Sequence, residues 1–228
     1  MTSKKGERKP MSRKKSRAIR VAIIVGVIVA GGFMIVTIPQ LLGYDLIFNN
    51  GGRYDASILN TMGVIYQDRE NITTFNEGYS ESSTCPWGFV HNGIDYFFAN
   101  GSNVLAAAPG QVKELSWRDN GAGVANRFFI RVNIQFNATV LLGYNFEPWT
   151  NFTADKDHQL ALIDVAQGDW VVKGQIIGKF LSVSQGHIHF DVIEKNERHC
   201  PSQYFGSSDL AEITGMIHDF HSWDLCYP

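Results

Sequence analysis

The sequence predicts an all-β domain preceded by one N-terminal transmembrane helix. From residue 85 onward, short runs rich in Val, Ile and Phe are separated by Gly, Asn and Pro, which is typical of the short strands of a sandwich or compact barrel. No strong amphipathic helix pattern interrupts these runs. Residues 21–44 form an uncharged, apolar stretch that is long enough to span a bilayer as a helix.

The charge distribution orients that helix. The first 20 residues hold nine Lys and Arg and one acidic residue, whereas the rest of the chain holds 11 basic and 21 acidic residues. Because basic residues flank only the amino-terminal end of the apolar stretch, residues 1–20 are expected to form a cytoplasmic tail, with the remainder outside the cell membrane. The basic tail is thus a topology signal, and no nucleic-acid partner is predicted. A cleaved signal peptide is the alternative, although no suitable small-residue cleavage site is present.

Two further features agree with a location outside the cell. Four N-glycosylation sequons follow the apolar stretch and begin at Asn71, Asn100, Asn137 and Asn151. The cysteines Cys85, Cys200 and Cys226 also follow it. In an oxidising compartment one pair can form a disulfide and leave one thiol free. A Cys200–Cys226 bond would tie down the carboxyl-terminal tail, and the two pairings through Cys85 remain open.

Composition divides the part beyond the membrane into three segments. Residues 45–84 are mixed and polar, and we expect a stalk that packs on the domain beyond it. Residues 85–205 hold the predicted strands, which are Asn103–Ala107, Gln111–Trp117, Phe128–Phe136, Thr139–Tyr144, Trp170–Val172, Ile176–Leu181 and His187–Ile193. Within this domain, the polar segment Glu147–Gln159 is expected to be an inserted surface loop. Residues 206–228 form a C-terminal tail with a short helix around Leu210–His218.

A weak internal repeat links two stretches of the β domain. Residues 101–104 are followed by Pro109-Gly110-Gln111-Val112, and residues 168–171 are followed by Lys173-Gly174-Gln175-Ile176. Each copy contains a turn, a strand, a glycine turn and a returning strand. The repeat therefore predicts two similar hairpins that face each other.

The stretch Gly186–Val192 alternates between polar and apolar residues, as a strand with one buried face does. His187 and His189 then lie on one face, and the apolar side chains between them lie on the other. A second stretch, His91-Asn92-Gly93-Ile94-Asp95, adds another histidine and a carboxylate. Catalytic zinc typically has three protein ligands and one open position, and a further residue that is not a ligand handles protons. Three histidines and one aspartate fit that division of roles.

At these residues the sequence resembles the lysostaphin-type zinc metallopeptidases, the murein endopeptidase family with the duplicated hybrid motif fold. The resemblance covers residues 85–205 and rests on HNGID, VLAAAPGQV, GDWVVKGQIIG and GHIHFDV in this order. It implies an antiparallel β-sandwich with Zn²⁺ in a groove. It also implies that His91, Asp95 and His189 are the metal ligands and that His187 is the catalytic histidine.

One position departs from the family pattern. The family has a further catalytic histidine in a segment that corresponds here to residues 140–146, and Tyr144 is assigned to that position. A tyrosine hydroxyl can donate a hydrogen bond to an oxyanion, but its ordinary pKa of about 10 makes it a poor base at neutral pH. The departure bears on hydrolysis more than on metal binding.

Three functions are compatible with these residues. The first is a membrane-anchored extracytoplasmic zinc metalloendopeptidase, which hydrolyses a cell-wall or surface peptide with zinc-activated water, assisted by His187 and Tyr144. The second is a catalytically impaired relative that acts as a binding or regulatory module. The third is a structural protein of the cell envelope, which the set of potential metal ligands disfavours.

Overall fold

The computed structural model describes residues 58–227. The predicted cytoplasmic tail and transmembrane helix, residues 1–20 and 21–44, lie outside the described residues, as does the start of the predicted stalk. Among residues 58–227 no helix is both long enough and apolar enough to cross a membrane.

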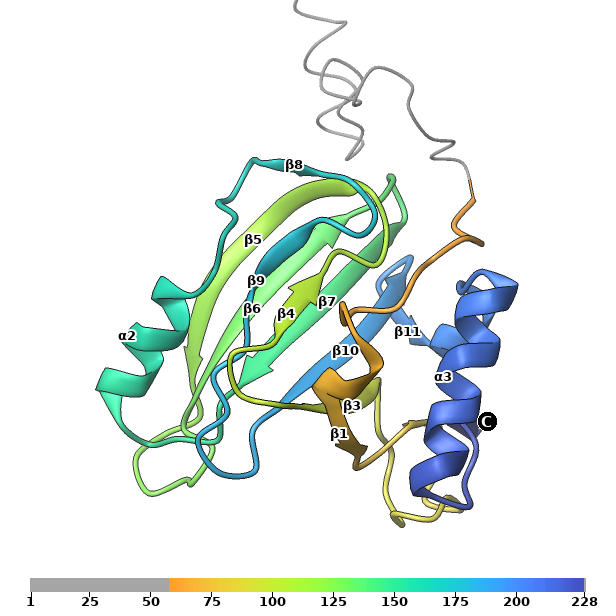
Figure 1. Ribbon diagram of the computed structural model, residues 1–228, viewed down its shortest axis with the longest axis horizontal. Coiled ribbons are helices and arrows are strands. Elements are labelled where there is room, and N and C mark those ends of the chain that lie inside the picture. The colour runs from red at the N-terminus through yellow and green to blue at the C-terminus, as the bar shows by residue number, and fades with distance from the viewer. Residues whose placement is uncertain (1–57, 228) are drawn as a thin grey trace, which may run out of the picture. The chain divides into compact units, whose positions relative to one another are not determined.

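The described residues form mainly β-strands (Figure 1). The strands are β1 (Ile72–Phe75), β2 (Tyr79–Ser80), β3 (Ile94–Phe98), β4 (Asn103–Leu105), β5 (Gly110–Asp119), β6 (Phe128–Gln135), β7 (Val140–Glu147), β8 (Trp170–Val171), β9 (Ile176–Lys179), β10 (His187–Glu194), β11 (Glu197–His199) and β12 (Cys226–Tyr227). The helices are α2 (Thr153–Ala161) and α3 (Ser207–Phe220), with short 3₁₀ turns η1 (Arg69–Asn71) and η2 (Pro201–Gln203). The sequence predicts an all-β domain, and the described residues are mostly β with few helices, so the class is confirmed in this coarser form.

One curled antiparallel sheet contains most of the strands (Figure 1). Its order is β1-β3-β10-β7-β6-β5-β8, with β11 paired to β10. Two small ribbons, β4–β9 and β2–β12, complete the β structure. Register shifts in the β1–β3 and β5–β6 pairs are β-bulge-like irregularities, which bend strands and increase twist. The arrangement is thus a half-barrel and differs from the expected sandwich of two comparable sheets.

The two faces of the sheet differ in polarity because successive side chains alternate between them. On the core face, β10 contributes Ile188, Phe190 and Val192, and all three are fully buried. The neighbouring strands contribute Leu142, Tyr144, Phe146, Ile130, Val132 and Ile134 to the same core. Residues of opposite parity on these strands, among them both histidines of β10, therefore lie on the other face.

The internal repeat forms strand pairs between its copies. The first strand of one copy, β4, pairs with β9 of the other copy, and β5 pairs with β8. Each copy therefore supplies one strand to each pair. The sequence predicts that each copy closes on itself as a hairpin, and the structure instead pairs the strands between the copies. The β4–β9 ribbon buries Val104 and Ile177 in the same core as the apolar face of the large sheet.

Segments on both sides of the predicted domain also belong to the core. Leu59, Met62 and Ile65, within the predicted stalk, are buried in it. The predicted helix near the carboxyl terminus is confirmed as α3, which buries Ile213, Met216 and Ile217. These apolar residues follow the spacing of one helix face, so α3 packs against the edge of the sheet at β1.

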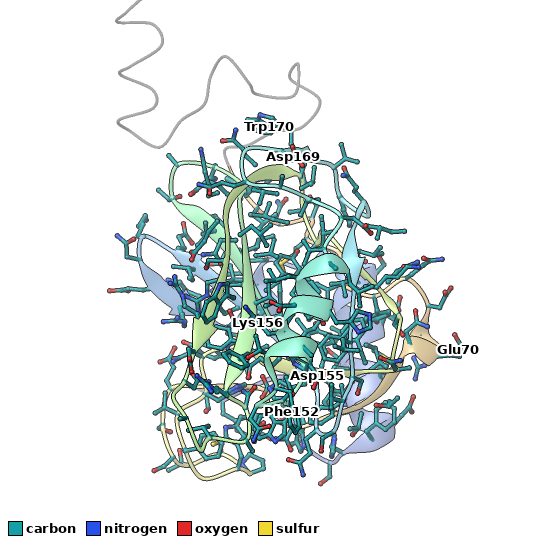
Figure 2. The ribbon with its side chains drawn as sticks, turned by 90° about the vertical axis from the view of Figure 1, so that its left-hand side faces the viewer. Glu70, Phe152, Asp155, Lys156, Asp169 and Trp170 are labelled. Carbon is teal, nitrogen blue, oxygen red and sulfur yellow. A yellow bond between two sulfur atoms is a disulfide. The ribbon has the colours of Figure 1, made fainter. Side chains whose placement is uncertain are left out.

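The predicted surface loop Glu147–Gln159 is instead partly helical, since α2 occupies its second half. Gln159 is fully buried on α2, where its amide donates to the carbonyl of Lys179 and accepts from the N–H of Leu181, both at 2.8 Å. Lys156 lies on the same helix, with its Nζ 4.4 Å from the ring centroid of Trp117. Figure 2 faces α2 and labels Asp155 and Lys156 on it. These contacts hold the helix to β9 of the small ribbon and to β5 of the large sheet.

Cys200 and Cys226 form the disulfide, with their Cα atoms 5.9 Å apart. The third cysteine, Cys85, is free and buried. The bond joins the segment after β11 to β12, which itself pairs with β2. It therefore fixes the last strand of the chain next to the segment that leads into β3.

Candidate metal centre

Three predicted site residues meet on the polar face of the sheet. His91 precedes β3, Asp95 lies on β3, and His189 lies on β10 directly opposite Asp95. One potential ligand atom from each of the three residues lies within 4.8 Å of the others. The pairing of β3 with β10 thus brings together residues that are 94 positions apart.

Hydrogen bonds fix the orientation of His91. Its backbone forms an isolated bridge with Ser80, whose hydroxyl accepts from the His91 N–H at 2.9 Å. The ring Nδ1 lies 2.8 Å from the carbonyl oxygen of Gly78, so Nδ1 is the protonated nitrogen that donates. The other nitrogen, Nε2, is directed at Asp95 at 3.3 Å. In metal sites, a hydrogen bond from one ring nitrogen to a backbone carbonyl commonly orients a histidine whose other nitrogen binds the metal.

Asp95 is the buried anionic centre of the group, with an exposed fraction of 5%. Its Oδ1 lies 2.8 Å from Nδ1 of His189. Burial disfavours the charged carboxylate, but hydrogen bonds from His189 and His91 outweigh that effect and hold the pKa of Asp95 well below its ordinary value. The same contacts act on His91: burial lowers its pKa, and the hydrogen bond to Asp95 outweighs burial and raises it.

Glu77 is a neighbour of the site that the sequence interpretation missed. Its backbone carbonyl accepts from the N–H of Asp95 at 2.9 Å. Burial and a hydrogen bond with the Asp95 carboxylate raise the pKa of Glu77 to about 7. Glu77 is part of a polar run that reads as a linker, and only the pairing of its segment with the start of β3 places it here.

His187 lies beside the three-residue group without joining it. Its Nδ1 lies 3.1 Å from the carbonyl of Gln185, which makes Nδ1 the donor. Its Nε2 lies between two carboxylates, 3.7 Å from Asp95 Oδ2 and 3.6 Å from Glu147 Oε2. The imidazole is therefore oriented by a carbonyl on one side and faces negative charge on the other.

Aromatic rings enclose the imidazole of His187. Phe97 stacks on it with centroids 5.2 Å apart, and Trp149 lies 5.5 Å away. Trp149 has a φ of 61°, in the left-handed region that non-glycine residues rarely adopt. This unusual conformation follows β7 directly and places the indole against the histidine.

The predicted role of Tyr144 is corrected by its position. Tyr144 is fully buried on the core face of β7, where its ring packs against Phe190 with centroids 5.0 Å apart. Its hydroxyl oxygen accepts from the N–H of Ala107 at 2.7 Å. Burial raises the pKa of Tyr144 well above its ordinary value. The hydroxyl is thus on the opposite side of the sheet from the histidines.

The residues of β7 that share the face of the histidines are Leu141, Gly143, Asn145 and Glu147. Asn145 lies directly opposite His189, and Glu147 lies opposite His187. Strand alternation could have identified them, because Leu142, Tyr144 and Phe146 have the parity of an apolar core face. Tyr144, which the resemblance assigns to the site, therefore lies one residue away from the face of the histidines.

The donor set fits zinc. Two imidazoles and one carboxylate are ligands that zinc favours, and three protein ligands leave a position open for water or substrate. The described residues hold no pair of cysteines at this site, which agrees with a catalytic type of site more than with a thiolate structural one. His187 lies beside these three residues, with its Nε2 3.7 Å from Asp95 Oδ2.

No protein-family model matches this chain, and no relative is found among curated proteins. Its fold is similar to several solved structures. Csd3 of Helicobacter pylori shares 22% identity over 68% of this chain and 38% of its own length, with a TM-score of 0.45. The catalytic domain of the antimicrobial peptidase lysostaphin from Staphylococcus simulans shares 22% identity over 58% of this chain and 91% of its own, with a TM-score of 0.39.

A zinc-containing peptidase from Vibrio cholerae shares 22% identity over 61% of this chain and 39% of its own length, with a TM-score of 0.39. The chain thus spans well under half the length of this peptidase and of Csd3. The family that the sequence motifs resemble, the lysostaphin-type metallopeptidases, takes its name from lysostaphin.

Proposed function

We propose that this chain is a zinc metalloendopeptidase that hydrolyses peptide bonds in a cell-wall or other surface peptide. The observation that supports the proposal is the cluster of His91, Asp95 and His189, with ligand atoms within 4.8 Å of one another. The second supporting feature is His187, which lies next to this cluster and outside the ligand set. A purely structural β domain has no need of this combination.

A zinc ion held by the three residues would polarise the peptide carbonyl and activate a water molecule. In the hydrolysis that we propose, the water oxygen bonds to the carbonyl carbon, and the C–N bond then breaks. One proton of the water finishes on the leaving amine. His187 is the residue placed to move that proton, because its Nε2 faces the site while its Nδ1 is occupied by Gln185.

Glu147 supports His187 in this role. Its carboxylate lies 3.6 Å from the histidine Nε2 and accepts a hydrogen bond from the amide of Asn126. A carboxylate at this distance stabilises the imidazolium that forms when His187 holds the proton. Asp95 Oδ2 lies at a similar distance, 3.7 Å from the same nitrogen, but Asp95 is assigned to the ligand set in this proposal.

We also propose that residues 21–44 anchor the protein in the cell membrane, with residues 45–228 outside. The uncharged stretch and the basic residues before it support this orientation. The four sequons and the Cys200–Cys226 disulfide are consistent with an oxidising, extracytoplasmic compartment. Glycosylation of the sequons is part of the same proposal.

The metal content of the purified full-length chain in detergent tests the site. We expect about one zinc per chain in the wild type and a strong loss in His91→Ala and in His189→Ala. His158→Ala is the matched control, because His158 is exposed on α2. Equal zinc in all four proteins would refute the site. Cleavage of glycine-rich and cell-wall peptides by the zinc-loaded wild type then tests the activity.

A binding or regulatory module that has lost turnover is the second candidate. It is favoured by the residues of β7 that face the two histidines. Glu147 lies opposite His187 and Asn145 lies opposite His189, so neither position holds a histidine. This candidate predicts that the wild type binds zinc and the peptides but cleaves none of them. Cleavage that is lost in His187→Ala while zinc is retained would exclude it.

A further inference from the structure

We propose that Asn145 is a catalytic hydrogen-bond donor, whose side-chain amide is oriented by Arg131 toward the carbonyl oxygen of the scissile peptide. This inference rests on the proposed peptidase function and adds a residue to that site. Asn145 supplies a fixed donor to an oxygen on which negative charge develops, and it transfers no proton.

The first supporting feature is the position of Asn145 in the sheet. Asn145 lies on β7 directly opposite His189 of β10, and Arg131 of β6 lies directly opposite Asn145. Residues that face each other across antiparallel strands have Cβ atoms roughly 4.5–5.5 Å apart. Asp95, His189, Asn145 and Arg131 therefore form one row across four strands, with Asn145 next to the ligand histidine.

The second supporting feature is the orientation of the amide. Nε of Arg131 donates to Oδ1 of Asn145 at 2.9 Å. A guanidinium has five donors and no acceptor, so it can be bonded only by the oxygen of the amide. The amide nitrogen of Asn145 must then be directed away from Arg131. A rotated amide would place its NH₂ group against the guanidinium and lose the bond.

The third supporting feature is that the amide nitrogen is available. Asn145 is 7% exposed, yet its Nδ2 donates to no other residue within 58–227 in any hydrogen bond of the structure. This nitrogen is not one of the fully buried, unpartnered polar atoms of the described residues, so it reaches solvent. On the strand face that it shares with His187 and His189, it is therefore free to donate to a molecule in the site.

The fourth supporting feature is the chemistry of the donor. An amide N–H bonds most strongly to an acceptor that carries negative charge, and the peptide carbonyl oxygen gains such charge as water adds to it. Asn145 has no proton to lose at neutral pH, so proton movement is left to His187. The structure thus separates two roles: His187 moves a proton, and Asn145 stabilises charge.

Kinetics of the zinc-loaded full-length chain provide the first test. We expect Asn145→Ala to lower kcat by about 10²–10³, with KM changed only a few-fold, as for loss of one such donor. Asn145→Asp keeps the shape and replaces the donor by an acceptor, so it should lose at least as much. Arg131→Ala, which frees the amide to rotate, should show a smaller loss in the same direction. Asn133→Ala is the control. Asn133 lies two residues after Arg131 on β6, and its amide donates to Glu114.

Calorimetry provides a test that does not depend on turnover. The probes are a phosphinic peptide, whose tetrahedral anion resembles the species formed during hydrolysis, and the corresponding amide peptide. We expect Asn145→Ala and Asn145→Asp to weaken phosphinate binding at least tenfold and amide binding much less, with zinc content unchanged. If the alanine variant does not fold, Asn145→Asp provides the result.

The outcomes separate this inference from the proposed function. A wild type that binds zinc but cleaves no peptide refutes the activity, and phosphinate binding still decides the role of Asn145. Equal weakening of both probes would make Asn145 a simple binding residue and overturn the inference. Unchanged kcat and unchanged phosphinate affinity in the Asn145 variants would overturn it as well.

Discussion

Gly93 lies directly against the imidazole of His189. A β-carbon at Gly93 would lie 2.8 Å from Nε2 and 2.9 Å from Cε1 of this histidine, and it would also collide with the carbonyl oxygen of Phe190. The glycine in His91-Asn92-Gly93-Ile94-Asp95 is therefore required by a neighbouring strand, because only a residue without a side chain lets β3 and β10 approach this closely.

Gly93→Ala is expected to displace His189 and to weaken zinc binding. We also expect a loss of about 1–3 kcal/mol in the free energy of unfolding, the usual result of overpacking. Zinc content and urea denaturation measure the two effects. Gly215→Ala on α3 is the control: nothing lies within 4 Å of its β-carbon position, so it should keep its zinc and gain roughly 0.5–1 kcal/mol. Full zinc content in Gly93→Ala would contradict this account of the site.

His187→Ala is expected to separate chemistry from metal binding. His187 lies outside the ligand set, so zinc content should stay at the wild-type level, whereas kcat should fall by about 10²–10⁴, the range for loss of a general acid or base. Metal analysis and peptide hydrolysis on the same preparation provide the comparison. Loss of zinc in this variant would show that His187 is itself a ligand.

Glu147→Gln is expected to slow turnover while the protein keeps its zinc. The substitution removes the negative charge 3.6 Å from Nε2 of His187 and preserves the size of the side chain. We expect a fall in kcat of roughly tenfold, equivalent to about 1.4 kcal/mol. Glu114→Gln serves as control, because Glu114 lies on the same face but bonds Ser116, Arg118 and Asn133. Equal rates in the two variants would remove Glu147 from the mechanism.

Tyr144→Phe should affect folding and leave the site intact. The hydroxyl accepts from the buried N–H of Ala107, and removing it leaves that donor without a partner. The expected cost is about 1–3 kcal/mol in the free energy of unfolding. Below the unfolding transition, zinc content and kcat should match the wild type. A large fall in kcat in a folded variant would return Tyr144 to the site.

The disulfide is expected to stabilise the domain, and the free cysteine is not needed for that effect. Replacing both Cys200 and Cys226 by Ser should lower the free energy of unfolding by about 2–4 kcal/mol, and dithiothreitol should have a similar effect on the wild type. The Cys85→Ser variant should respond to dithiothreitol as the wild type does. Denaturation of the three proteins with and without reductant measures these differences in the free energy of unfolding. If Cys85 were part of the disulfide, Cys85→Ser would lose stability and would no longer respond to dithiothreitol.

The local sequence alone indicated the strands from β4 to β10 and the chemical types of the candidate ligands, but not β3, which carries Asp95. Alternation in β10 separates His187 and His189 from the apolar residues between them, because side-chain direction in a strand has period two. At β7 the same rule places Tyr144 on the core face, whereas the family pattern assigns it to the site, and a shift of one residue exchanges one face for the other. Tyr144 was placed in the site, although the pattern of Leu142 and Phe146 assigns it to the core.

Only the tertiary structure decided which residues surround the ligands. Glu77 reaches Asp95 through the approach of its segment to β3, and Glu147 and Asn145 meet the histidines through the pairing of β7 with β10. Such contacts depend on strand order and register, which join positions far apart in the chain. Short-range patterns carry information about side-chain direction and do not specify the partner strand, so the sequence indicated the candidate ligands through the family resemblance, and the fold determined their neighbours.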